Sequence, residues 1–157
     1  MFKNPILKNT LAAVAIAVVG FALLNFTFIF DFLFQSLVMW CIRLFTPLDL
    51  MRTYDWFPWM MHSLFVIIIG LISWPVFRSK LAVLYKAIFM TVPVAVVLVT
   101  IGISFYRWPM VAYSISGLIS LGILYYFYRS RQPWLYYFSV ILVSLALLVM
   151  GLLGVEI

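Results

Sequence analysis

The sequence predicts an all-α membrane protein, a polytopic bundle of five transmembrane helices with its N-terminus in the cytoplasm and its C-terminus outside. Of its 157 residues, 68% are hydrophobic and 9% are charged. A soluble fold has too little interior to bury so much apolar surface. A membrane-spanning chain must satisfy its backbone polar groups internally, which leaves helices or closed barrels. The apolar runs are continuous and do not alternate with polar residues, so helices are predicted.

Five apolar runs each approach the roughly 20 residues that cross the hydrocarbon core. The first follows Lys3 and Lys8, and we interpret it as an uncleaved anchor because no small-residue cleavage site follows it. Together the runs predict a single transmembrane domain over residues 1–157. The predicted spans are residues 11–30, 59–77, 83–105, 110–128 and 134–155.

The segment from 31 to 46 is too short for a further span and too apolar for a free loop. At 100° per residue, Asp31, Gln35 and Arg43 fall on one side of a helix, with apolar residues elsewhere. We therefore predict an amphipathic helix in the outer interface. A continuation of the first helix and a re-entrant segment are the alternatives.

The basic residues predict the orientation. Seven of the ten lie before the first span or at the second and fourth connections, with Lys86 in the first turn after the second, on one side of a five-span chain. All four acidic residues lie on the other side, and cytoplasmic loops are the ones enriched in Lys and Arg. The seven are Lys3, Lys8, Arg78, Lys80, Lys86, Arg129 and Arg131.

A period of 51 residues relates two predicted helical hairpins, 57–105 and 108–156. The basic turn Arg78-Ser79-Lys80 matches Arg129-Ser130-Arg131, and Pro58 matches Pro109. Duplication of a hairpin is one explanation. The other is that two hairpins of equal topology share a proline start and a basic turn.

Three groups of residues are candidate sites. The first, on the predicted outer face, consists of Arg43, Asp49, Arg52, Asp55, His62 and Arg107. Here His62 would act as a base oriented by Asp55, with an arginine binding an anionic substrate; the alternative is a loop whose charges pair with one another and with headgroups. The second group, for lipid headgroups or an acidic partner, is Arg78, Lys80, Lys86, Arg129 and Arg131. The third, a ridge of small residues for helix packing or a homo-oligomer contact, is Ala112, Ser116 and Ser120.

No Asp, Glu, Lys, Arg or His lies deep inside a predicted span, which argues against proton relays and intramembrane hydrolases. We therefore expect a small non-catalytic membrane protein that binds a lipid-like ligand or serves as a subunit of a membrane complex. The alternatives are an oligomeric transporter or channel component and an outer-face enzyme acting on lipid headgroups. We expect membrane lipids as partners, no nucleic acid, no metal and no cofactor, and a bacterial cytoplasmic membrane as the location.

Overall fold

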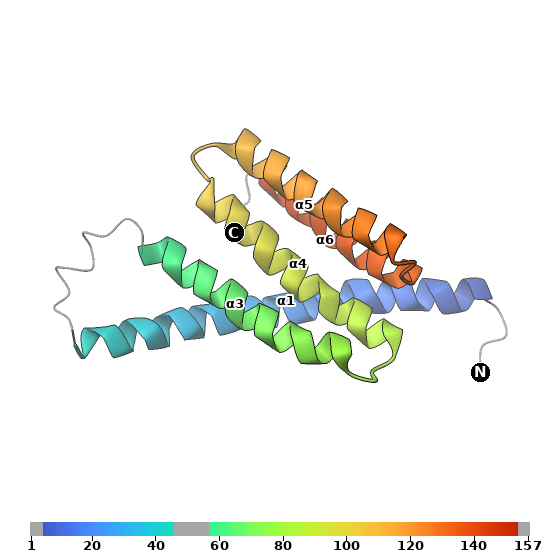
Figure 1. The fold of residues 1–157 in the computed structure, drawn as a ribbon, viewed down its shortest axis with the longest axis horizontal. Helices are drawn as coiled ribbons and strands as arrows, with labels where there is room; N and C mark the ends of the chain where they lie inside the picture. The colour runs from blue at the N-terminus through green and yellow to red at the C-terminus, as the bar shows by residue number, and fades with distance from the viewer. Residues whose placement is uncertain (1–4, 46–56, 154–157) are drawn as a thin grey trace.

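The computed structural model describes residues 5–45 and 57–153, which form long helices joined by short turns. The order is α1 (Pro5–Arg43), α3 (Phe57–Arg78), α4 (Val83–Ser104), α5 (Pro109–Arg129) and α6 (Trp134–Leu152), as Figure 1 shows. All five are long and apolar enough to cross a membrane. Over the residues that the structure describes, the prediction of an all-helical protein with five such helices is confirmed.

Helices α3 to α6 form two hairpins joined by the connection 105–108. Pro109 occupies the first turn of α5 and Pro133 lies just before α6, where a missing backbone N–H breaks no helical hydrogen bond. The turns 79–82 and 130–133 lie at the same end of the bundle as the start of α1, and the connection 105–108 lies at the opposite end (Figure 1). The basic turns therefore share one end of the molecule.

The predicted boundary between a first span and a separate helix at residue 31 is absent. Residues 31–43 continue α1 without a break, as in one of the alternatives. The reason is local, because neither proline nor glycine occurs between Gly20 and Pro47. At 1.5 Å per residue the 39-residue helix is about 58 Å long, almost twice the roughly 30 Å hydrocarbon core. Helix α1 crosses the others obliquely and extends past them at both ends (Figure 1).

Helix α4 is the centre of the bundle and packs against each of the other four helices. Its residues are small or β-branched on several faces, so neighbours approach it on all sides. One core cluster joins α4 to α1, α5 and α6 through residues such as Ile16, Ala95 and Val140. A second cluster joins α4 to α3 around Phe65 and Val92.

Two close contacts join α1 and α6 to α4. A Cβ atom added at Gly20 of α1 would lie 3.0 Å from Cγ2 of Thr91, so a larger residue there would displace the Thr91 side chain by a few tenths of an ångström. On the α6 side, the buried Ser139 hydroxyl donates to the backbone oxygen of Ala87 at 2.7 Å. The second contact holds α6 beside the first turns of α4, at the basic end of the bundle.

Candidate ligand-binding site

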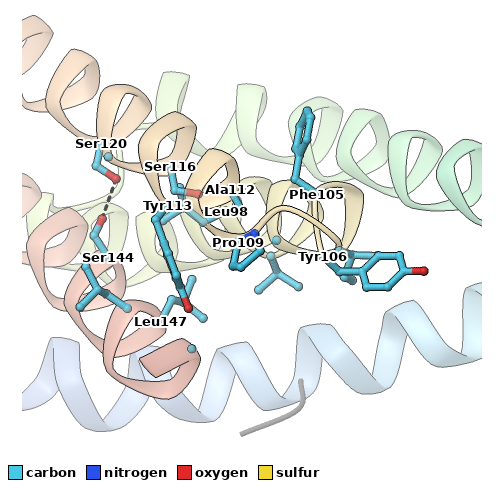
Figure 2. Close-up of a pocket in the computed structure, with 16 residues that line it drawn as sticks. Leu98, Phe105, Tyr106, Pro109, Ala112, Tyr113, Ser116, Ser120, Ser144 and Leu147 are labelled. Carbon is cyan, nitrogen blue, oxygen red and sulfur yellow. Dashed lines mark hydrogen bonds between the residues drawn. The ribbon is translucent and has the colours of Figure 1, made fainter. Parts of the chain in front are cut away.

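A cavity of about 760 Å³ lies between α4, α5 and α6, at the end of the bundle where α4 and α5 connect (Figure 2). Exposed residues such as Tyr106 and Leu148 line it, so the cavity reaches the molecular surface. Its wall is mostly apolar. The lining comprises Leu98, Val99, Gly102, Ile103, Phe105, Tyr106, Pro109, Ala112, Tyr113, Ser116, Gly117, Ser120, Ser144, Leu147, Leu148 and Gly151.

Small side chains create this space. The three residues of the predicted packing ridge, Ala112, Ser116 and Ser120, all line the cavity. Ala112 and Ser120 are buried, and Ser116 is half-buried. A Cβ atom added at Gly102 or Gly117 would meet nothing within 4 Å. The ridge therefore forms part of a cavity wall in addition to bringing helices together.

The polar end of the cavity is a pair of hydroxyl groups. The Oγ atoms of Ser120 on α5 and Ser144 on α6 lie 2.9 Å apart, and either can be the donor (Figure 2). Ser144 lies outside the three candidate groups predicted from the sequence. A signal for it exists, because Ser120 and Ser144 each lie twelve residues from Gln132 in the turn, and an antiparallel hairpin brings such residues together.

Tyr113 bridges α5 and the last turns of α6. Its side chain passes from α5 toward Leu147 (Figure 2), and its hydroxyl would lie 2.8 Å from a Cβ atom placed at Gly151. Glycine at position 151 thus makes room for the tyrosine ring. The ring forms the side of the cavity nearest the end of α6.

The cavity carries no charge. Among the described residues that line it, the polar side chains are serines and tyrosines, and none is Asp, Glu, Lys, Arg or His. An uncharged, largely apolar concavity with a few placed hydroxyl groups is typical of sites for small organic ligands. It is unsuited to a metal ion, and the described residues contain no group of three His, Cys, Asp or Glu side chains that could bind one.

The predicted outer-face group is only partly within the described residues. Asp49, Arg52 and Asp55 lie outside them. His62 is described, and a carboxylate beside it is that of Asp31: His62 Nδ1 and Asp31 Oδ2 lie 3.9 Å apart. Gln35 donates to the same Asp31 oxygen at 2.9 Å, while the buried Oδ1 has no hydrogen-bond partner.

The two described arginines of that group lie on other elements than His62, which belongs to α3. Arg43 ends α1, about 18 Å along the helix axis from Asp31. Arg107 lies in the α4–α5 connection, where its Nε donates to the Tyr106 hydroxyl at 2.9 Å. The contact between Asp31 and His62 was not predicted, because residue 31 was expected in a separate interfacial helix.

The predicted inner-face group divides into internal and exposed members. Lys86 donates from Nζ to the backbone oxygen of Phe77 at 2.8 Å, which satisfies a carbonyl at the C-terminal end of α3. Arg78 lies over the ring of Trp74, with 4.5 Å between the guanidinium carbon and the ring centroid. The exposed members are Arg78, Lys80, Arg129 and Arg131.

Comparison of the sequence with family models and with curated proteins, and of the fold with solved structures, found no match.

Proposed function

We propose that this chain is a non-catalytic integral membrane protein that binds a lipid-like molecule in the cavity between α4, α5 and α6. The observation that supports this most is the cavity itself: about 760 Å³, walled by apolar side chains, with the Ser120–Ser144 pair at one end. Pockets for small molecules span roughly 300–1,000 Å³ and combine apolar walls with a few polar groups.

The surroundings support a ligand that arrives through the lipid. Large apolar side chains on the outer faces of α5 and α6, such as Leu118 and Leu145, are exposed, as expected for helices that contact acyl chains. A lipid-like molecule would pass from the bilayer into the cavity without crossing water.

The experiment tests the cavity by placing one large side chain in it. Gly102 lines the cavity and Gly70 on α3 does not, yet a Cβ atom meets nothing within 4 Å at either position. Gly102→Leu and Gly70→Leu are thus matched: each adds the same side chain to open space and the same helix propensity. Native mass spectrometry after gentle extraction should show a retained apolar molecule in the wild type and in Gly70→Leu, and its loss in Gly102→Leu.

Circular dichroism and size-exclusion chromatography establish that both variants are folded. Equal retention in the two variants would contradict the proposal, as would a wild-type protein that retains no small molecule.

We further propose the orientation in which the basic end faces the cytoplasm, in a bacterial cytoplasmic membrane. The support is the location of the turns 79–82 and 130–133 at one end with the start of α1. In a Cys41→Ser background, Ser79→Cys and Ser130→Cys should resist an impermeant thiol reagent in intact cells, and Glu156→Cys should react. Labelling of Ser79→Cys in intact cells would overturn the orientation.

A further inference from the structure

Ser120 and Ser144 depart from the hydrogen-bonding pattern of most other helical hydroxyl groups in this chain. Those groups donate to a carbonyl three or four residues earlier in their own helix, which removes a polar group from the apolar surroundings. Ser120 and Ser144 instead point at each other across the α5–α6 contact, at the polar end of the cavity. The residues that follow the common pattern include Thr10, Thr27, Ser73, Thr91, Thr100 and Ser114.

The pair has hydrogen-bonding capacity left over. A hydroxyl group has one hydrogen to donate and two lone pairs to accept with. One serine donates to the other, so the hydrogen of the accepting serine is unused in the hydrogen bonds of the described residues. The pair therefore offers a ligand one donor and several acceptor positions, which suits a hydroxyl or carbonyl group.

The absence of charged side chains in the described lining limits the charge that a ligand can carry. No acidic or basic side chain lines the cavity among the described residues, and its remaining wall is apolar apart from Ser116 and two tyrosines. A carboxylate, phosphate or ammonium group placed beside Ser120 would lose its hydration without gaining a counter-charge. A neutral polar head loses far less on entering the same place.

We propose that the ligand is a neutral lipid, such as an acylglycerol or long-chain alcohol, whose hydroxyl or carbonyl head binds the Ser120–Ser144 pair. Its chain then runs along Leu98 and Leu147 toward the α4–α5 connection. This inference rests on the proposed function, and adds to it the class of ligand and its direction in the cavity.

Two photoreactive probes test the class. Both carry the same long chain with a diazirine next to the head; one is a monoacylglycerol and the other an alkylsulfonate, which stays charged at every accessible pH. After irradiation with the protein in lipid vesicles, the monoacylglycerol should label peptides that contain Ser120 or Ser144. The sulfonate should label them at least about tenfold less, a difference of about 1.4 kcal/mol in binding.

The double variant Ser120→Ala with Ser144→Ala tests the head contact. Because both partners of the hydrogen bond are replaced by apolar groups, the fold is expected to persist. Labelling of this double variant by the monoacylglycerol should fall severalfold. The control is Ser114→Ala: the Ser114 hydroxyl donates to the carbonyl of Met110 in its own helix, so this variant should be labelled like the wild type.

The outcomes separate this inference from the proposed function. Equal labelling by both probes, labelling confined to the α4–α5 connection, or indifference to the double variant would overturn the neutral-head inference, provided that Gly102→Leu still abolishes labelling. Labelling that Gly102→Leu leaves unchanged would instead overturn the cavity as the binding site.

Discussion

The two hairpins of this bundle have turns at matching positions and different surroundings. Helix α3 ends at Arg78 and α5 at Arg129, while α4 begins at Val83 and α6 at Trp134, so the turns correspond at an offset of 51 residues. Among the described helices, the return helix of the first hairpin, α4, packs extensively against each of the others. Turns of equal length have thus been placed in unequal positions.

The correspondence extends to the backbone at the first and last residue of each turn. The residue before α4, Ala82, has φ −59° and ψ 148°, and the residue before α6, Pro133, has φ −57° and ψ 146°. Ser79 and Ser130 both donate their backbone N–H to the carbonyl four residues earlier, at 2.9 Å. Local sequence accounts for such turns in any pair of similar hairpins, and duplication of an ancestral hairpin stays a prediction.

Burial separates residues that the offset equates. Tyr85 and Tyr136 both lie in the first turn of a return helix, yet Tyr85 is 62% exposed and Tyr136 is 8% exposed. The ring of Tyr136 packs against Phe127, with 5.8 Å between centroids. A turn geometry therefore does not determine which side chains become core; the position of the hairpin in the bundle does.

The largest expected effect comes from this tyrosine pair. Tyr136→Ala should lower the free energy of unfolding by about 3 kcal/mol, because a buried aromatic ring is lost and leaves a cavity. Tyr85→Ala removes the same atoms from an exposed position and should change it by about 0.5 kcal/mol. Unfolding by denaturing detergent, followed by circular dichroism, measures both. Similar losses in the two variants would show that the hairpins are equivalent in packing.

A second prediction concerns the hydrogen bond that joins the hairpins. Ser139→Ala removes the donor to the Ala87 carbonyl and should lower the free energy of unfolding by about 1 kcal/mol. The control Ser114→Ala breaks only a bond within α5, to the carbonyl of Met110, and should have little effect. The same detergent titration compares them. An equal effect in the control would mean that the bond between hairpins adds nothing beyond a local one.

A third prediction concerns the backbone conformation that differs between the two turns. Arg131 has φ 50°, and its N–H and that of Gln132 bond the carbonyls of Tyr128 and Phe127, which is the Schellman arrangement usually ended by glycine. Arg131→Gly should raise the free energy of unfolding by about 1 kcal/mol, because the left-handed conformation no longer strains a side chain. Thermal unfolding in detergent micelles measures the change.

Lys80 is the matched control, since it lies at the same offset, carries the same charge and has a negative φ. Lys80→Gly should lower the stability by a few tenths of a kcal/mol through added freedom in the unfolded chain. A gain in both variants would assign the effect to the lost charge and not to the backbone.

The sequence predicts one wall of the candidate site but not the residues that pack opposite it. The small-residue spacing of Ala112, Ser116 and Ser120 is visible in the sequence and marks one wall of the cavity. The partner Ser144 is visible only once the α5–α6 turn is located. Nothing in the sequence brings Asp31 to His62, because that contact requires α1 to continue unbroken and to cross α3.

The sequence by itself determined the helical class, the five long apolar helices and the ends of both hairpins. These are local properties, set by apolar length, proline position and charge. Only the tertiary structure decided that α4 is central, that α1 is a single long helix crossing the others, and that a cavity remains between α4, α5 and α6. The physical reason is that lipid and protein interior are equally apolar, so hydropathy does not distinguish a residue that faces one from a residue that faces the other.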